Sequence, residues 1–441
     1  MNRLENETTG VFNKKQIIIA ITLVILLTIF GSYLGYQKEM LSIQLFSGVL
    51  LGGALTRTRF GYAGGIKRIY VRGEGSLSKA LLIMLLATML IFMGVQWYAA
   101  QNGAVPAFSA VEGDAIIPGT QNVQFANLAT VIGGVLFGMG MIFSGGCASG
   151  TLTDMGEGEG RAMFVFIFFI LGSAPGEWAR YTFDNTGLGK VGTQIYLPDY
   201  FGYFGALLIS VLGLLFIYWL ILKYEKKRKA EGTYANPKGD WENFEKPVTD
   251  IKASETSLLS YKTYHRLFVE RWTFNTGALV IAIICSFILL ATGKAWGVTS
   301  AFSKLGVAIL QPLGISFSSP AFTEIVEDVN KGLLLDGGTI RNLGIVFGSL
   351  VAFLLAGRFK LSLKLNKSDL PYFVVGGLLM GFGARFAKGC NAGAMYSAMS
   401  TFSISGWIFA VAMVLGGLIS LKVFAGKMSL IPAKRKNKQI Y

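Results

Sequence analysis

Charged residues, cysteine and histidine are all scarce in this sequence of 441 residues. Charged residues make up 15% of the chain, against about 25% in a typical soluble domain, and this excludes a water-soluble globular protein. Three cysteines cannot form a closed framework of disulfides, and no two of them have the spacing of a redox pair or a zinc knuckle. A single histidine argues against haem or a histidine-rich metal site. We therefore expect no metal and no cofactor.

Apolar residues are abundant, since hydrophobic residues make up 52% of the chain and the mean hydropathy is +0.53. Much of the chain must therefore lie in lipid. The net charge of +15 comes from lysines and arginines in short blocks between long apolar runs, without one basic face or an RNA-binding motif. Nucleic acid is thus not an expected partner, and the lipid bilayer is. In a membrane protein such blocks mark cytoplasmic loops.

Ten apolar runs approach or reach the length of about 20 residues that crosses a bilayer. Several are short and interrupted by glycine, as in helices that pack inside a bundle or stop partway through it. We therefore expect an all-α, polytopic membrane protein with about ten transmembrane passes. The runs lie at 17–36, 41–55, 80–98, 127–143, 162–175, 202–222, 274–292, 342–357, 371–387 and 405–423. A further apolar piece at 295–315, broken by Pro312, is expected to be re-entrant or interfacial on the outer side.

The distribution of charge predicts the sidedness of the chain. Lys14 and Lys15 precede the first run, and counting passes from a cytoplasmic start places the basic loops inside and the acidic loop with Glu112 and Asp114 outside. Both termini are therefore expected in the cytoplasm. We expect a first membrane half at 1–222, a charged cytoplasmic linker at 223–271, a second membrane half at 272–425 and a basic cytoplasmic tail at 426–441.

The chain contains an internal repeat. Residues 133–150 align without a gap on 376–393, and the same seven positions hold glycine or cysteine in both copies. Cys147 aligns with Cys390, although the chain has only three cysteines. The count of passes gives the two copies opposite directions, and inverted repeats with broken helices are typical of transporters. Each copy is expected to be a glycine-rich half-helix, a Gly-Cys turn at 145–150 or 388–393, and a re-entrant second helix.

The chemistry of such a turn favours an anion. A helix amino terminus carries unpaired N–H donors and a partial positive charge, and Gly146 and Gly389 allow a close approach of the backbone. The thiols of Cys147 and Cys390, if buried and neutral, can offer S–H to an anion without repelling it. A soft sulfur matches an anion with a terminal sulfur better than a hydroxyl does. These four residues are the first candidates for substrate binding and translocation.

Further candidates lie beside the second turn. Arg385 and Lys388 precede Cys390 by less than two helical turns, where an unpaired charge at the bilayer centre is costly. They either draw the anion into the outer half of the path or extend to the headgroups. Asn391 either donates its amide to the ion or caps a helix. Cys285, in an ordinary apolar run, is predicted to be inert packing.

The glycine-rich and cysteine-containing motifs GMGMIFSGGCASGTL at 138–152 and GFGARFAKGCNAGA at 381–394 resemble those of the bacterial YeeE/YedE sulfur-transport family. The resemblance covers roughly residues 48–421. It implies a transporter and not an enzyme, located in the bacterial inner membrane, which takes up thiosulfate. It also implies an hourglass-shaped protein in which cysteine thiols pass the ion along.

One motif departs from the family pattern. Family members of the thiosulfate type carry a further cysteine in an early motif of the form Arg-x-x-Phe-Cys-Phe. Residues 57–64 here read Arg-Thr-Arg-Phe-Gly-Tyr-Ala-Gly, so Gly61 stands where that cysteine would fall. The resemblance therefore leaves two of the family's three thiols, and it assigns Gly61 to the inner exit of the path.

Two other classes of function stay open at this point. One is a membrane thiol redox relay or sulfur-handling enzyme in which Cys147 and Cys390 exchange a disulfide. The other is a transporter or channel for a different small anion, or a membrane subunit that hands its cargo to a cytosolic sulfurtransferase. Thiosulfate and such a sulfurtransferase are the expected partners besides lipid.

Overall fold

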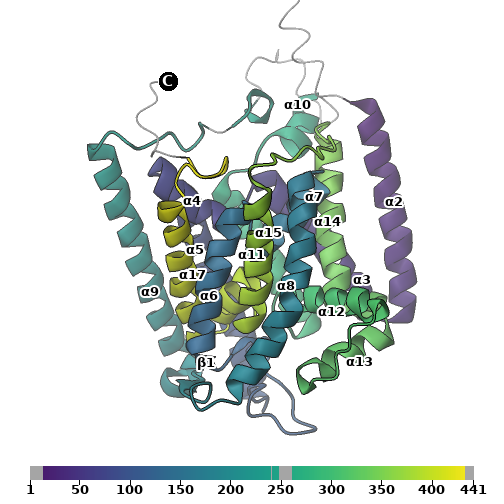
Figure 1. Cartoon of the computed structure of the whole chain (residues 1–441), viewed down its shortest axis with the longest axis vertical. Coiled ribbons are helices and arrows are strands. Elements are labelled where there is room, and N and C mark those ends of the chain that lie inside the picture. The colour runs from purple at the N-terminus through teal and green to yellow at the C-terminus, as the bar shows by residue number, and fades with distance from the viewer. Residues whose placement is uncertain (1–12, 240, 248–260, 433–441) are drawn as a thin grey trace, which may run out of the picture.

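A computed structural model describes residues 13–239, 241–247 and 261–432. Within these ranges the regular secondary structure is helical, apart from an antiparallel pair of two-residue strands, β1 (Ala126–Asn127) and β2 (Gly192–Thr193) (Figure 1). The α-helices are α2 (Lys14–Gln37), α3 (Glu39–Thr58), α4 (Tyr62–Arg72), α5 (Ser76–Gln101), α6 (Leu128–Ser144), α7 (Ala148–Gly156), α8 (Gly160–Asp184), α9 (Leu197–Ala230), α10 (Tyr261–Tyr264), α11 (Phe274–Thr292), α12 (Thr299–Leu310), α13 (Thr323–Lys331), α14 (Gly337–Leu355), α15 (Leu370–Phe386), α16 (Ala398–Ser400) and α17 (Ile404–Val423). Short 3-10 and π-helical segments are η1 (Thr120–Asn122), η2 (Asn243–Glu245), η4 (His265–Val269), η5 (Gln311–Leu313), η6 (Pro320–Phe322), η7 (Leu333–Leu335) and η8 (Asn391–Ser397).

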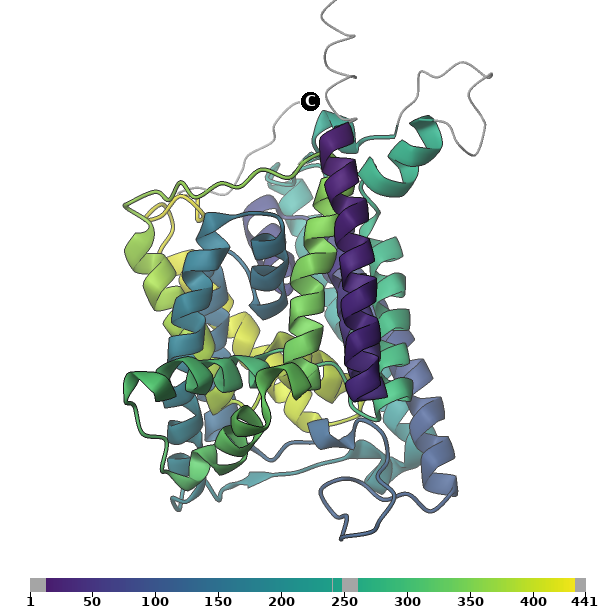
Figure 2. The same ribbon diagram turned by 90° about the vertical axis from the view of Figure 1, so that its right-hand side faces the viewer.

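The predicted membrane passes are confirmed. Within the described ranges, nine spans are long and apolar enough to cross a bilayer, and a tenth is formed by a pair of helices at 370–386 and 391–400 that meet at 43°. Each of the ten apolar runs coincides with one of these spans. The extra apolar piece at 295–315 contains α12, which lies crosswise at the edge of the bundle with α13 (Figures 1 and 2).

The inverted repeat is built on the pair α6 and α15. A Cβ atom at Gly133 would lie 2.7 Å from the carbonyl oxygen of Gly383, and one at Gly140 would lie 2.7 Å from that of Gly376. The start of α6 therefore packs against the end of α15, so the two helices are antiparallel. Small residues permit this close backbone contact. The opposite directions expected of the two copies are thus confirmed.

Matching glycines of the two copies make matching contacts with other helices. A Cβ atom at Gly138 would lie 2.1 Å from the carbonyl oxygen of Met413 on α17. A Cβ atom at its repeat partner Gly381 would lie 2.1 Å from that of Phe169 on α8. The repeated glycines therefore make the same kind of close helix contact twice, between α6 and α17 and between α15 and α8.

The outer helices present apolar side chains to the surroundings. Helices α2 and α9 lie at the flanks of the bundle (Figure 1), and both carry many exposed large hydrophobic residues, including Ile18, Leu26 and Ile29 on α2 and Leu212, Leu215 and Phe216 on α9. In Figure 2, α2 lies along the outside of the bundle next to α14. Exposed apolar surface of this extent is stable only in lipid, and the chain is therefore a multi-pass membrane protein.

The beginning of α2, the end of α17 and the segment with α10 lie at the same face of the bundle (Figure 1). Helix α9 continues to Ala230, so the first eight residues of the expected linker extend this helix. Among the remaining described residues of that region, Glu245 pairs with Arg59, which follows α3, and with Arg358, which follows α14. The basic residues at 434–436 of the expected tail lie outside the described residues.

Candidate translocation site at the two Gly-Cys turns

The first Gly-Cys turn interrupts a span between α6 and α7. Helix α6 ends at Ser144, and Gly145 takes a left-handed conformation with φ of 77°, which glycine adopts without strain. Cys147 then stands at the N-cap of α7, in extended backbone conformation, and is buried. Its Sγ lies 3.5 Å from the hydroxyl of Ser149. The thiol is therefore held at a helix amino terminus inside the bundle.

The second turn repeats this geometry with different residues. Helix α15 ends at Phe386, and Lys388 takes the left-handed conformation with φ of 59°, at the position that Gly145 occupies in the first copy. Cys390 stands at the N-cap of η8, again in extended conformation, and is buried. A Cβ atom at Gly389 would lie 2.7 Å from the backbone nitrogen of Ala394, so only glycine fits there. The two half-helices that the sequence predicts are both present.

The helical segments that follow the two turns, α7 and η8, contact each other in the interior of the bundle. The Cys390 thiol lies close to the backbone N–H groups of Ala392 and Gly393 and to the Thr299 side chain. Tyr62 is buried close enough to all three cysteines to interact with them electrostatically. In the described part of the chain its hydroxyl has no hydrogen-bond partner. One polar group thus lies near both repeated thiols.

Asn391 follows Cys390 and is completely buried. Both its amide nitrogen and its amide oxygen lack a hydrogen-bond partner among the described residues. An unpaired buried amide is costly, typically about 1–3 kcal/mol. This residue is therefore not acting as a side-chain cap of η8, and its amide is available to a guest in the site.

Cys285 lies on α11, is fully buried and is close to the Tyr396 hydroxyl. That hydroxyl also lies 2.6 Å from the Thr88 hydroxyl. The third thiol is therefore a neighbour of the second Gly-Cys helix, although it lies in a regular helix and not at a turn.

A cavity of about 790 Å³ reaches the second turn from the face opposite the linker. Arg385, Lys388, Gly389 and Gly393 are among its lining residues. Six cationic side chains and two anionic ones line it, namely Lys38, Lys294, Lys304, Arg341, Arg385, Lys388, Glu324 and Asp336. The lining is therefore electropositive, which attracts an anion.

Arg385 and Lys388 both line this cavity, and both also have carboxylate partners on α8. Arg385 pairs with Glu177, and the Lys388 ammonium lies 3.3 Å from Asp184. Their charges are therefore partly compensated.

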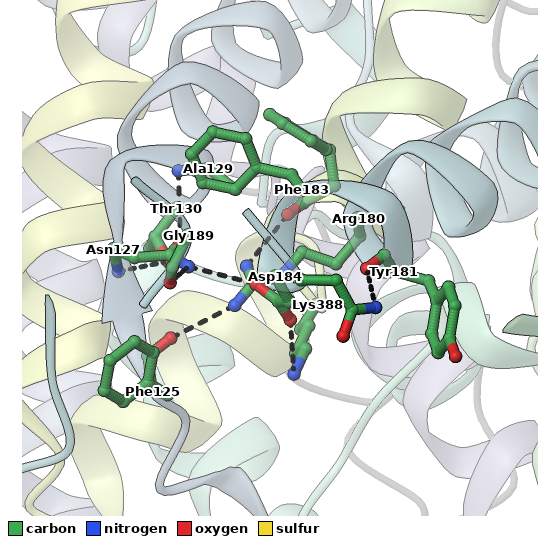
Figure 3. A network of polar contacts seen from close by, with 12 residues as sticks. Phe125, Asn127, Ala129, Thr130, Arg180, Tyr181, Phe183, Asp184, Gly189 and Lys388 are labelled. Atoms are coloured by element: carbon green, nitrogen blue, oxygen red, sulfur yellow. Dashed lines mark hydrogen bonds and ion pairs between the residues drawn. The ribbon is translucent and has the colours of Figure 1, made fainter. Parts of the chain in front are cut away.

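Figure 3 shows Asp184 at the centre of a polar network that joins three chain segments. Asp184 accepts hydrogen bonds from the Asn127 amide at 3.0 Å and from the Arg180 guanidinium at 2.8 Å. Arg180 also donates to the carbonyl oxygens of Phe386 and Phe125. The start of α6, the end of α8 and the second Gly-Cys turn are thereby tied together.

The first turn borders an acidic cluster. Carboxylate oxygens of Asp154, Glu157 and Glu159 lie within 4.8 Å of one another. The Arg161 guanidinium contacts the carboxylates of Asp154 and Glu159 at 2.5 and 2.6 Å. Arg161 thus neutralises part of the cluster. Burial, together with the charge of Asp154, raises the pKa of Glu157 to about 8. Burial thus favours the uncharged carboxyl, which repels an anion less than a carboxylate does. A Cβ atom at Gly146 would lie 3.5 Å from the Asp154 carboxylate.

Gly61 stands at the N-cap of α4 with φ of −158°, a conformation that any residue adopts. A Cβ atom there would have no neighbour within 4 Å. Its neighbour Tyr62 carries the buried hydroxyl near the thiols. The backbone at Gly61 is therefore unstrained, and there is open space where the side chain of the family's cysteine would lie.

The structure adds residues that the sequence alone did not single out: Tyr62, Thr299, Arg341 and Tyr396. Two had a local signal, because Tyr62 follows Gly61 in the early motif and Tyr396 lies six residues after Cys390 in the same helical segment. Arg341 immediately precedes an apolar run, and a charge at membrane depth is itself a functional signal. No local pattern marks Thr299, which reaches Cys390 through tertiary packing.

Comparison with known proteins agrees with this architecture. A family model described as sulphur transport matches residues 57–419. The thiosulfate transporter TsuA of Escherichia coli is 27% identical over 383 residues, which make up 86% of this chain and 93% of that protein. TsuA of Spirochaeta thermophila is 26% identical over 306 residues, or 66% and 75% of the two chains. The probable transporter YedE of Escherichia coli is 28% identical over 172 residues, or 39% and 41%. The match of the family model over most of its length shows that this chain belongs to the YeeE/YedE sulphur-transport family.

Proposed function

We propose that this protein imports thiosulfate across the bacterial inner membrane by transient contacts with two cysteine thiols at helix amino termini. The observation that carries the proposal is the pair of inverted Gly-Cys turns, with one buried thiol on each, whose following helical segments contact each other in the interior. The names of the TsuA relatives support thiosulfate as the cargo. The electropositive cavity that reaches the second turn supports a negative one.

The order of contacts follows from the placement of these groups. The anion enters the cavity and exchanges part of its hydration for the backbone N–H groups of Ala392 and Gly393 and the amide of Asn391. The thiol of Cys390 meets the soft terminal sulfur, and the thiol of Cys147 takes it over. Neutral S–H groups bind weakly, so the ion can leave again, as conduction requires. The ion departs past Gly61 at the opposite face.

The remaining parts of the proposal concern orientation and organisation. The face that carries the linker is the cytoplasmic one, with both termini there. Two membrane halves, 1–222 and 272–425, are joined by the linker 223–271, and the basic tail 426–441 follows. The protein acts as a transporter without metal or cofactor, and a cytosolic sulfurtransferase consumes the imported sulfur.

The first test is uptake of radiolabelled thiosulfate in cells without other sulfate or thiosulfate importers. We expect Cys147→Ala and Cys390→Ala each to lower the uptake rate at least about tenfold. A tenfold change in rate corresponds to about 1.4 kcal/mol of stabilisation of the transition state for transport. Cys285→Ala is the matched control, because it removes an equally buried thiol that is not at a turn, and it should retain most of the activity.

If both turn variants are present in the membrane at parental levels and accumulate as much thiosulfate as the parent, thiol contacts do not carry the ion. Competition by sulfite, sulfate and selenium anions identifies a different cargo. A disulfide between Cys147 and Cys390 that forms readily in the native protein would instead favour the redox relay.

Gly61→Cys tests the departure from the family motif. The open space around Gly61 accommodates a thiol without displacing a neighbour. We therefore expect thiosulfate flux to be preserved or increased in this variant, with Gly61→Ala as the control for the added Cβ atom. A folded Gly61→Cys protein without flux would show that Gly61 has a structural duty of its own.

A further inference from the structure

Arg341 carries a buried guanidinium that the described chain leaves largely unpaired. It lies in the second turn of α14, and its exposed fraction is 6%. Its Nη2 donates to the Gly297 carbonyl oxygen at 3.3 Å, but Nε and Nη1 have no partner among the described residues. A buried charge without a counter-ion costs several kcal/mol. A protein retains such a group where a ligand supplies the missing negative charge.

Among the ionisable groups around Arg341, Asp336 acts on its charge from beyond ion-pair distance, and most of the other charged groups that line the cavity are cations. Asp336 binds Lys304 at 2.6 Å and caps α14 through the Thr339 backbone N–H at 2.7 Å. Among the other cavity-lining residues, Glu324 is an acid, and Lys38, Lys294, Arg385 and Lys388 are further cations. The Cys285 thiol faces Arg341 from α11. In the described part of the chain, Arg341 thus has no carboxylate as an ion-pair partner.

Arg341 also lies next to the second Gly-Cys turn. The Gly297 carbonyl that it binds belongs to the loop between α11 and α12, and Asn342 holds the same loop through the Val298 carbonyl at 2.9 Å. On its other side this loop approaches the turn, since the Gly297 Cα would lie 3.9 Å from a Cβ atom at Gly393. Arg341, Gly297 and Gly393 line one cavity. An anion bound by Arg341 is therefore adjacent to the entry of the thiol site.

We propose that Arg341 is the docking site for the oxygen end of a small tetrahedral oxyanion, at the inner end of the cavity. Its unpaired N–H groups donate to the oxygens, and charge-assisted bonds to such oxygens are about twice as strong as neutral ones. With thiosulfate as the guest, the oxygens rest on Arg341 and the terminal sulfur is directed to Cys390. The identity of the guest as thiosulfate rests on the proposed function. The binding of an oxyanion by Arg341 does not.

The test uses the purified full-length protein, with binding of sodium thiosulfate and sodium sulfate measured by calorimetry. We expect Arg341→Gln to weaken the binding of both anions at least about tenfold, and Arg341→Lys to weaken it less. Lys331→Gln is the matched control, since it removes an exposed cation that is not part of the cavity lining, and its affinities should stay within about twofold of the parent.

Thermal unfolding separates anion docking from a merely structural role. Removing an unpaired buried charge should leave Arg341→Gln at least as stable as the parent without anion, and added sulfate should raise the Tm of the parent but not of the variant. A variant that unfolds at lower temperature than the parent without anion, or that binds both anions like the parent, would overturn the proposal. Arg341-dependent binding in a parent that imports no thiosulfate would contradict the proposed function alone.

Discussion

Replacing Gly52 with alanine is expected to leave little folded protein in the membrane. Helix α3 packs so closely on α14 that a Cβ atom at Gly52 would lie 2.1 Å from the Ile345 carbonyl oxygen and 2.9 Å from the Ser349 backbone nitrogen. Backbone atoms inside two packed helices cannot move aside, so the helices must separate. Overpacking of this kind costs about 3 kcal/mol or more, which exceeds the gain of about 1 kcal/mol from the helix propensity of alanine.

The adjacent residue supplies the control. A Cβ atom at Gly53 would have its nearest neighbour, the Gly348 carbonyl oxygen, at 4.0 Å, so Gly53→Ala gains helix propensity without a clash. The measurement is the monodisperse fraction of solubilised protein in size-exclusion chromatography, together with its Tm. Equal yield and Tm for the two variants would mean that α3 and α14 do not pack as closely as described.

Glu245→Ala should produce the second largest loss. This linker residue is 1% exposed, and its carboxylate lies 2.8 Å from Arg59, 2.9 Å from Arg358 and 4.0 Å from Arg271. Arg59 follows α3, whereas Arg358 follows α14, so one carboxylate joins the linker to the ends of both helices. Burial lowers the pKa of the Arg358 guanidinium, and Glu245 opposes this shift. Removing the carboxylate leaves Arg358, which is 17% exposed, with only the more distant and exposed Glu242 as a counter-charge, and breaking a buried pair costs about 3–5 kcal/mol in unfolding free energy.

Glu242→Ala is the matched control for charge. Glu242 approaches the same arginines, at 3.4 Å from Arg59 and 4.0 Å from Arg358, but its side chain is 54% exposed. Exposed pairs contribute about 1 kcal/mol or less. We therefore expect a clear fall in Tm for Glu245→Ala and a small one for Glu242→Ala. Similar Tm values for the parent and Glu245→Ala would show that the ion pairs of Glu245 with Arg59 and Arg358 do not stabilise the fold.

Several features of the site follow from the internal repeat in the sequence. The shared register of Cys147 and Cys390 predicts two equivalent helix breaks, and both breaks are present with a cysteine at the N-cap. The residue type at the left-handed position differs between the copies. It is Gly145 in the first copy and Lys388 in the second, although both residues take the same conformation. A repeat in sequence thus predicts the backbone path, but not which residue types will tolerate it.

Other features depend on contacts between segments that are far apart in the chain. The approach of Tyr62 to the three cysteines, of Thr299 to Cys390 and of Arg341 to the loop at Gly297 arises only when α4, α11, α12 and α14 pack together.

The sequence alone determined the helical passes and their inversion, because hydropathy and glycine spacing act over one or two helical turns and lipid admits few backbone structures. Only the tertiary structure decided which polar groups face the thiols and which cation lacks a counter-ion. Those properties depend on burial and on pairing across the bundle, and neither is a property of any single segment.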